Sequence, residues 1–200
     1  MSSRVALPIV PVRVKGKGCN NYITTHALLD TGSDRIFCSQ SLIKRLNING
    51  VSTSLSLSTL NDNKESDVVE VSLEVSSVID TESPAISLPI VFAVQTFPTL
   101  VSSIARTTDI EMWEHLKDLP IPHVDASDVT LIIGQDVPDA LYPLEKRKGK
   151  VGEPYAIRTP FGWTVNGPVR KIAVKKPATC NFINSLTSSD TALENQVAQF

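Results

Sequence analysis

The sequence lacks a hydrophobic run long enough to cross a membrane and lacks an excess of charge of either sign. Its longest clear apolar run, Ile86–Val94, is interrupted by Pro89 and is much shorter than the roughly 20 residues that a spanning helix needs. The 19 Lys and Arg residues are balanced by 21 Asp and Glu residues, so the net charge is −2. A nucleic-acid-binding domain usually carries a basic excess. Neither a membrane nor a nucleic acid is therefore an expected partner.

Cysteine is scarce as well. The three cysteines, Cys19, Cys38 and Cys180, cannot all pair within one chain, and no CxxC or Cys/His cluster suggests a metal site. Free thiols are typical of a reducing compartment. The first residues run from Met-Ser-Ser-Arg into Val-Ala-Leu-Pro, which is too short for a secretory signal. We expect an intracellular protein, cytoplasmic by default, with no metal and no other cofactor.

What the sequence has in abundance is β-branched residues: 21 Val, 16 Ile and 16 Thr among 200 residues. These side chains favour strands, so we expect a mostly β fold. Residues Val69–Val75 alternate apolar and polar, which is typical of a half-buried strand, and Val129–Ile133 is a short apolar run typical of a buried one. A C-terminal hairpin is predicted at Tyr155–Val165. Further strands are predicted at Leu7–Val14, Tyr22–Leu29 and Ala85–Val94.

Helical patterns are few. Ser39–Leu46 predicts one short helix with Ser39 as its N-cap. A second, amphipathic helix is predicted within Ser102–Leu119, because Ile110, Trp113, Leu116 and Leu119 follow a helical spacing. The domain is expected to cover residues 1–170. Residues 171–200 are mostly polar without sustained periodicity, and we interpret them as a linker or tail.

The most informative stretch is Leu28-Leu29-Asp30-Thr31-Gly32-Ser33, in which an apolar strand delivers a carboxylate into a tight turn. The tetrapeptide Asp-Thr-Gly-Ser is also ordinary β-turn chemistry, so a turn without activity stays open as an interpretation. Two features favour a site. The turn follows a hydrophobic strand, and a second apolar-apolar-Gly element, Ile132-Ile133-Gly134, comes late in the chain after a polar hairpin.

This arrangement resembles the retropepsins, the aspartic proteases of retroviruses and retrotransposons. Within them the sequence is most similar to the peptidase domain of Pao/Bel-type retrotransposon polyproteins. The blocks that carry the likeness are His26–Ser33, Trp113–Leu119 and Arg158–Pro168, in this order along the chain. The resemblance implies a closed, barrel-like β fold with one or two short helices and an added C-terminal hairpin.

The same resemblance implies a set of site residues. Asp30 would be the catalytic acid/base, supported in its turn by Thr31, Gly32, Ser33 and Asp34. A flap over the substrate would be formed by Thr59, Leu60, Asn61, Asp62 and Asn63. The loop behind the active site would be formed by Ile132, Ile133 and Gly134.

Peptide hydrolysis by this chemistry needs two carboxylates that share one proton. The chain contains one Asp-Thr-Gly, and Asp80-Thr81-Glu82 lacks the glycine. A symmetric homodimer with one Asp30 from each subunit is therefore expected. Its substrate would be an extended polypeptide, the retrotransposon's own polyprotein, bound by β-augmentation in the cytoplasm or in virus-like particles. The Ser33 hydroxyl can donate to Asp30 and so favour its ionised form, which predicts a more acidic pH profile than with Ala at position 33.

Two departures from the family pattern stand out. Gln135 follows the late glycine where many relatives carry an Arg that pairs with the residue equivalent to Asp34, and Thr96–Asp128 is an insertion. Alternative functions are a non-catalytic retropepsin-like module for dimerisation or peptide binding, and a β-rich adaptor without a cleft. The basic runs Lys146–Lys148 and Lys171–Lys176 are most simply solvated surface, with weak contact to packaged RNA as the alternative.

Overall fold

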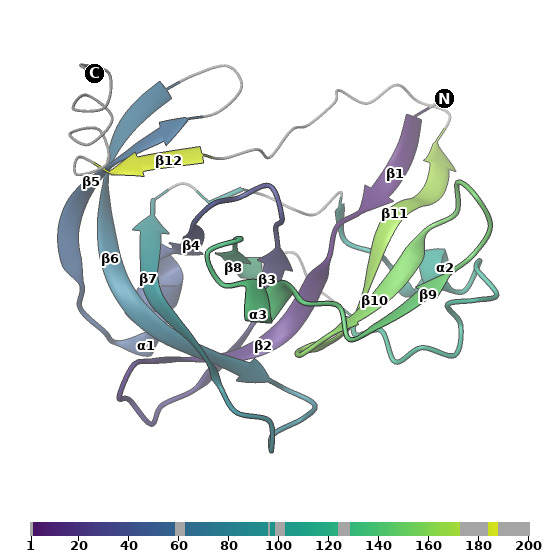
Figure 1. The fold of residues 1–200 in the computed structure, drawn as a ribbon, viewed down its shortest axis with the longest axis horizontal. Coiled ribbons are helices and arrows are strands. Elements are labelled where there is room, and N and C mark those ends of the chain that lie inside the picture. The colour runs from purple at the N-terminus through teal and green to yellow at the C-terminus, as the bar shows by residue number, and fades with distance from the viewer. Residues whose placement is uncertain are drawn as a thin grey trace, which may run out of the picture.

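Two β-sheets form most of the structure, which is a computed structural model (Figure 1). It describes residues 2–58, 63–95, 97–98, 103–123, 129–172 and 184–187. Within these ranges the chain is mostly β, with a closed six-stranded barrel and few short helices. The expectation of a mostly β, barrel-like fold is confirmed at this level.

The barrel closes because its first and last strands pair with each other. Its strand order is β6-β2-β3-β8-β4-β7, and β6 also pairs with β7. Beyond β6 the sheet continues through β5 to β12. The strands are β2 (Ile9–Gly16), β3 (Ile23–Leu29), β4 (Ile36–Ser39), β5 (Val51–Ser58), β6 (Asn63–Ser77), β7 (Ile86–Val94), β8 (Val129–Ile133) and β12 (Asn184–Thr187).

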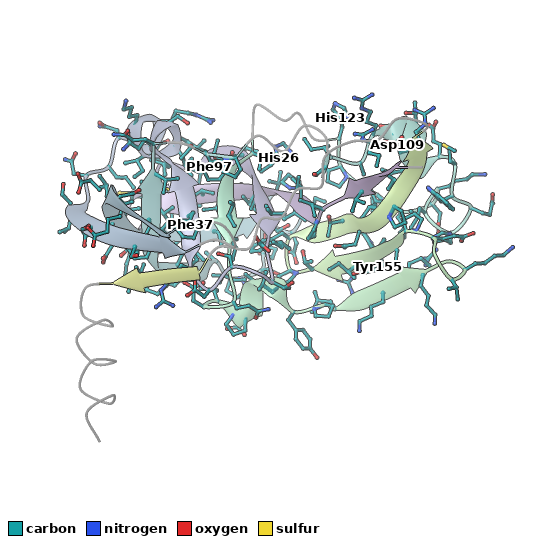
Figure 2. All side chains as sticks on the ribbon, turned by 90° about the horizontal axis from the view of Figure 1, so that it is seen from above. His26, Phe37, Phe97, Asp109, His123 and Tyr155 are labelled. Carbon is teal, nitrogen blue, oxygen red and sulfur yellow. The ribbon has the colours of Figure 1, made fainter. Side chains whose placement is uncertain are left out.

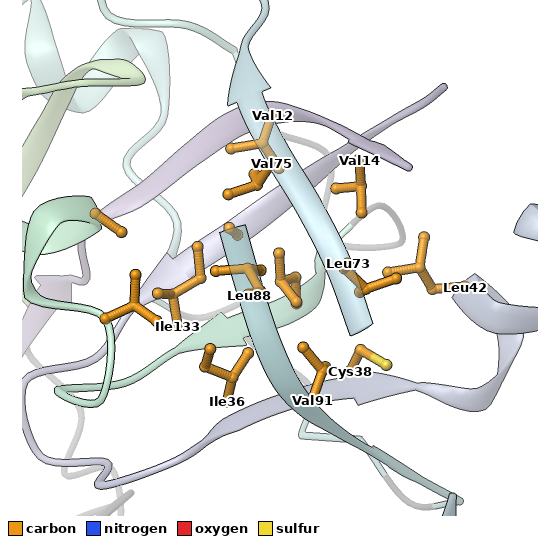
Figure 3. Close-up of a cluster of buried hydrophobic side chains, with 14 of the residues drawn as sticks. Val12, Val14, Ile36, Cys38, Leu42, Leu73, Val75, Leu88, Val91 and Ile133 are labelled. Atoms are coloured by element: carbon orange, nitrogen blue, oxygen red, sulfur yellow. The ribbon is translucent and has the colours of Figure 1, made fainter. Parts of the chain in front are cut away.

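Strand β8 lies between β3 and β4, parallel to the former and antiparallel to the latter. Both faces of these three strands are covered. One face lines the inner cluster of the barrel, drawn in Figure 3, and the other packs in an outer cluster. Burial on both faces explains why Val129–Ile133 is apolar except at Thr130. The inner cluster includes Val12, Val14, Ile36, Cys38, Leu42, Leu73, Val75, Leu88, Val91 and Ile133. The outer cluster comprises Ile9, Leu28, Phe37, Leu55, Val68, Phe92, Ile104, Val129 and Ile132.

The second sheet has the order β1-β11-β10-β9 and lies beside the barrel (Figure 1). Its strands are β1 (Ser2–Ala6), β9 (Glu145–Lys148), β10 (Tyr155–Thr159) and β11 (Gly162–Ile172). The predicted hairpin at Tyr155–Val165 is confirmed as β10 and β11. Strands β1 and β9 escaped the sequence analysis because neither has a clear alternation of apolar residues. Strand β11 extends past residue 170, and β12 lies in the segment interpreted as a linker.

The predicted short helix is confirmed as α1 (Gln40–Leu46). Its N-cap is Ser39, whose hydroxyl accepts the backbone N–H of Leu42 at 3.3 Å. At the other end Asn47 adopts a left-handed conformation with φ 53° and closes the helix with backbone hydrogen bonds, as is common at helix C-termini. The buried side chains Leu42, Ile43 and Leu46 attach α1 to the inner cluster.

The prediction of an amphipathic helix within Ser102–Leu119 that carries Ile110, Trp113, Leu116 and Leu119 is wrong. The described part of this segment has a four-residue helix, α2 (Thr107–Ile110), followed by turns. Successive N–H groups of Trp113, Leu116 and Leu119 each donate to the carbonyl three residues earlier. In such tight turns, apolar side chains spaced three residues apart stay on one face. In an α-helix, which has 3.6 residues per turn, each successive side chain would be rotated further from that face.

A third short helix, α3 (Pro138–Leu141), had no predicted counterpart, so the described residues contain three helices rather than one or two. Pro138 at its first position is a common helix start. None of the helices described is long and apolar enough to cross a membrane.

Candidate active site

The Asp-Thr-Gly-Ser segment forms a tight turn at the end of β3. The backbone N–H of Asp30 donates to the carbonyl of Ile133 at 2.9 Å, and so continues the β3–β8 ladder by one residue. The N–H of Gly32 donates to Oδ1 of Asp30 at 2.9 Å, and the N–H of Ser33 donates to the Asp30 carbonyl at 3.3 Å. Both the backbone and the carboxylate of Asp30 are thereby fixed.

The turn is in direct backbone contact with the residues that follow β8. The N–H of Gln135 donates to the carbonyl of Ser33 at 2.8 Å. A Cβ atom on Gly134 would lie 2.5 Å from the carbonyl oxygen of Arg35 and 2.7 Å from that of Ser33, and no side chain fits at such distances. The structure thus brings together Leu28–Ser33 and Ile132–Gly134, which are far apart in the sequence.

The electrostatic surroundings of Asp30 favour its protonated form. The side chain is half-buried. This burial raises the pKa of the Asp30 carboxyl, while the hydrogen bond from the Gly32 N–H partly opposes the shift. Among the described residues, no charged group contributes to the shift. Within the described residues, no second carboxylate is therefore among the groups that shift the pKa of Asp30.

The expected hydrogen bond from Ser33 to the Asp30 carboxylate is absent within the chain. Ser33 is 1% exposed, and its hydroxyl donates to the carbonyl of Arg35 at 2.7 Å. The side chain is turned into the loop, where it donates to a backbone acceptor. Ser33 therefore stabilises the turn and does not assist ionisation of Asp30. Thr31, in contrast, is exposed beside the half-buried Asp30.

Arg35 is a charged residue of this loop that the sequence analysis missed. Its Nη1 donates to the carbonyl of Asp34 at 3.1 Å. The pKa of Asp136 is raised, chiefly by burial and also by the charge of Asp34. The charge of Arg35 and a hydrogen bond from the N–H of Ile36 to the Asp136 carboxylate oppose the shift. A cation thus lies near two carboxylates although position 135 is Gln. The signal was present in the sequence, as Arg35 adjoins Asp34 and Asp136 follows Gln135.

The predicted flap falls largely outside the described residues. Thr59, Leu60, Asn61 and Asp62 are not described, and of Asn63 only the backbone of β6 is. The body of the hairpin is described. Strands β5 and β6 pair from Val51 to Ser58, and Leu55 and Val68 pack in the outer cluster with residues of β3, β4 and β8. The hairpin is therefore attached to the strands that carry the Asp30 turn.

A second Asp-Thr dipeptide, Asp80-Thr81, has the opposite environment. The hydroxyl of Ser83 donates to Oδ2 of Asp80 at 2.6 Å, and the backbone N–H groups of Glu82 and Ser83 donate to Oδ1. These hydrogen bonds, led by that of the Ser83 hydroxyl, lower the pKa of Asp80, which is exposed to solvent. Asp80 is a turn-forming residue, and it contrasts with the half-buried Asp30.

A search of the described residues finds no group of three or more His, Cys, Asp or Glu side chains placed to hold a metal ion. Comparisons of the chain with protein-family models, curated proteins and solved structures find no match.

Proposed function

We propose that this chain is a retropepsin-like aspartic endopeptidase that works as a homodimer. The observation that carries the proposal is the state of Asp30. Its carboxyl is half-buried, its pKa is raised, and its backbone is joined to Ile133 behind the turn. Perturbed carboxyls on rigid turns are typical of acid/base sites. An exposed Asp30 loop would have favoured the alternative of a β-rich adaptor without a cleft, but Asp30 is half-buried.

Hydrolysis requires a second carboxylate, and within the described residues none is among the groups that shift the pKa of Asp30. In a symmetric dimer, the Asp30 of a second copy would lie across the two-fold axis. Two adjacent carboxylates cannot both ionise cheaply, so the pair would hold one proton. The ionised member would take a proton from the attacking water, and the protonated member would donate to the scissile carbonyl. Thr31, which is exposed, would contact the partner's turn, as the resemblance implies.

The substrate we propose is an extended polypeptide, the polyprotein of a Pao/Bel-type retrotransposon, cleaved in the cytoplasm or in virus-like particles. The proposal of this context rests on the sequence resemblance. An extended chain would lie between the β5–β6 hairpin and the Asp30 turn and would bind through main-chain hydrogen bonds, as in β-augmentation.

The test compares three proteins: the unmodified chain, Asp30→Asn and Asp80→Asn. Each is incubated with a peptide library from about pH 4 to about pH 7, and products are identified by mass spectrometry, so that no cleavage site need be known beforehand. Molecular mass in solution is measured in parallel. We expect cleavage by the unmodified chain and by Asp80→Asn, and none by Asp30→Asn.

Mixing separates a dimeric from a monomeric catalyst. An excess of Asp30→Asn chain should suppress the activity of the unmodified chain, because mixed dimers hold one carboxylate only. Equal cleavage by the unmodified chain and Asp30→Asn would refute the mechanism. A dimer that cleaves nothing would favour the alternative, a non-catalytic retropepsin-like module that dimerises or binds peptides.

A further inference from the structure

The second sheet has one covered face and one open face at its β9–β10 edge. The covered face packs Ala156, Trp163 and Val165 against the segment that includes Ile110 and Leu116. Residues alternate between faces along a strand, so Tyr155 and Ile157 lie on the opposite face from Ala156. In Figure 2, Asp109 lies at α2 and Tyr155 on the β9–β10 side of the sheet.

Basic residues of β9 share the open face. In the antiparallel register Lys148 is opposite Tyr155, and Lys146 is opposite Ile157. Directly opposed residues point to the same face. Both lysines are exposed, and the Tyr155 ring is 45% exposed. An aromatic side chain is therefore flanked by basic ones.

Two of the acidic groups near this hairpin are paired with arginines. Glu145 pairs with Arg158 at 3.2 Å, and Asp118 pairs with Arg147 at 3.1 Å. Glu153 accepts the backbone N–H of Lys150 at 2.8 Å, and its Oε2 lies 3.8 Å from Nδ1 of His115, so one carboxylate stands among three lysines. Within the described part of the chain, Lys146, Lys148 and Lys150 form no ion pair, so their charges are available to an external anion.

The hairpin is also concave and held in shape. A cavity of about 340 Å³ is lined by Lys146, Lys148, Lys150 and Tyr155, and also by Arg147 and the acidic Glu153. This volume is typical of a small-ligand site. His115 contacts the hairpin from behind: its Nε2 lies 2.8 Å from the carbonyl oxygen of Pro154. A Cβ on Gly149 would lie 2.3 Å from Cε1 of His115, so the close approach needs glycine.

We propose that this surface, defined by Lys146, Lys148, Lys150 and Tyr155, binds single-stranded nucleic acid. Such sites combine two elements: basic side chains that follow the phosphate backbone, and an aromatic ring on which a base stacks. An acidic polypeptide would use the lysines but would gain little from an exposed ring lining a cavity of nucleotide size. The overall charge of −2 does not oppose binding, because screening limits charges to a range of roughly 10 Å at 0.1 M salt. The proposal is independent of the proposed protease function.

The test measures fluorescence anisotropy of a labelled oligouridylate titrated with the full chain at several salt concentrations. Three neutralised phosphates predict a slope of about −2 for log affinity against log salt, at about −0.7 per contact in a single strand. The triple variant Lys146→Ala, Lys148→Ala, Lys150→Ala should lose most of the affinity. Tyr155→Ala should weaken binding about tenfold, whereas Tyr155→Phe, which keeps the ring, should not.

A matched triple variant, Lys17→Ala, Lys44→Ala, Arg45→Ala, removes the same charge from exposed positions after β2 and on α1 and should bind normally. All variants change exposed residues, and circular dichroism checks that each remains folded. Equal losses in the two triple variants, or no binding at all, would overturn the proposal. The proposal would also be overturned if a polyglutamate peptide bound as tightly as the oligouridylate and Tyr155→Ala had no effect. An acidic polypeptide would then be the partner.

Discussion

Gly134 and Arg35 are in contact through their backbones: a Cβ on Gly134 would lie 2.5 Å from the Arg35 carbonyl oxygen. This contact joins the segment after β8 to the loop that carries Asp30. With the hydrogen bond from Asp30 to Ile133 and that from Gln135 to Ser33, it holds the loop from behind. The geometry of Asp30 therefore depends on a residue far from it in the chain.

Gly134→Ala should consequently destabilise the fold by about 1–3 kcal/mol, the usual cost of forcing atoms into a packed interior. Urea denaturation measures the change. Gly18→Ala is the control: an added Cβ there meets nothing within 4 Å, although its φ of +76° strains any side chain. If Gly134→Ala lost no more stability than Gly18→Ala, the result would contradict the contact. If peptide cleavage were lost in Gly134→Ala and kept in Gly18→Ala, the loop geometry would matter for activity.

Ser33→Ala should cost about 1 kcal/mol of stability, because it removes one buried hydrogen bond and leaves the Arg35 carbonyl without its hydroxyl donor. Since the hydroxyl does not contact the Asp30 carboxylate, the pH profile of any cleavage should stay where it is. This expectation replaces the one drawn from sequence. A shift of the profile to higher pH in Ser33→Ala would show that the hydroxyl turns to Asp30 when the site is complete.

The main elements around the site could be predicted because their patterns are local. The apolar strand before Asp30, the buried run before Gly134 and the Ser39-capped helix each follow from side-chain type and spacing. The side-by-side packing of β3 and β8 was expected only by resemblance. Pairing between distant strands has no local signal, since many registers satisfy the same apolar pattern.

Other features could not be predicted for physical reasons. The segment after α2 has an apolar residue every three positions, which resembles the spacing of a helical face at each single step. Over the whole segment only a row of tight turns keeps these residues on one face. Strand β9 consists of Glu145-Lys146-Arg147-Lys148 and is stabilised by pairing with β10 rather than by burial. The direction of the Ser33 hydroxyl depends on where the Arg35 carbonyl lies, and only the folded loop determines that.

A buried ion pair connects β1 to α2 and offers a test of the second sheet. Nη1 of Arg4 lies 2.6 Å from Oδ2 of Asp109, and the side chains are 8% and 0% exposed. Arg4→Met should destabilise by about 3–5 kcal/mol, because it leaves a buried carboxylate without its cation. The double variant Arg4→Met, Asp109→Leu should recover most of the loss, as apolar replacements of buried pairs often do.

The exposed pair between Arg158 and Glu145 supplies the control, and Arg158→Ala should cost at most about 1 kcal/mol. Thermal and urea denaturation of the four proteins give the comparison. An Arg4→Met variant no less stable than Arg158→Ala would mean that Asp109 is not held in the buried position described.

Asp30→Asn should stabilise the protein at neutral pH. Burial raises the pKa of Asp30 above its value in the unfolded chain, so the folded state holds the proton more tightly. The corresponding stability is fully present below the unfolded pKa and is lost as the pH rises through the folded pKa. Asparagine does not ionise, so the gain should appear near pH 7 and vanish near about pH 3. Urea midpoints at the two pH values measure it.

Asp80→Asn should have the opposite effect and destabilise the protein at neutral pH. Hydrogen bonds, led by that of the Ser83 hydroxyl, lower the pKa of Asp80. The stability that the Asp80 carboxylate contributes is therefore present at neutral pH and is lost on acidification through the folded pKa.

A destabilising effect of Asp30→Asn at neutral pH would mean that the Asp30 carboxylate is not desolvated. A second Asp30 across a dimer axis would raise the pKa of one carboxyl further, so the gain from Asn should increase at protein concentrations at which the chain dimerises.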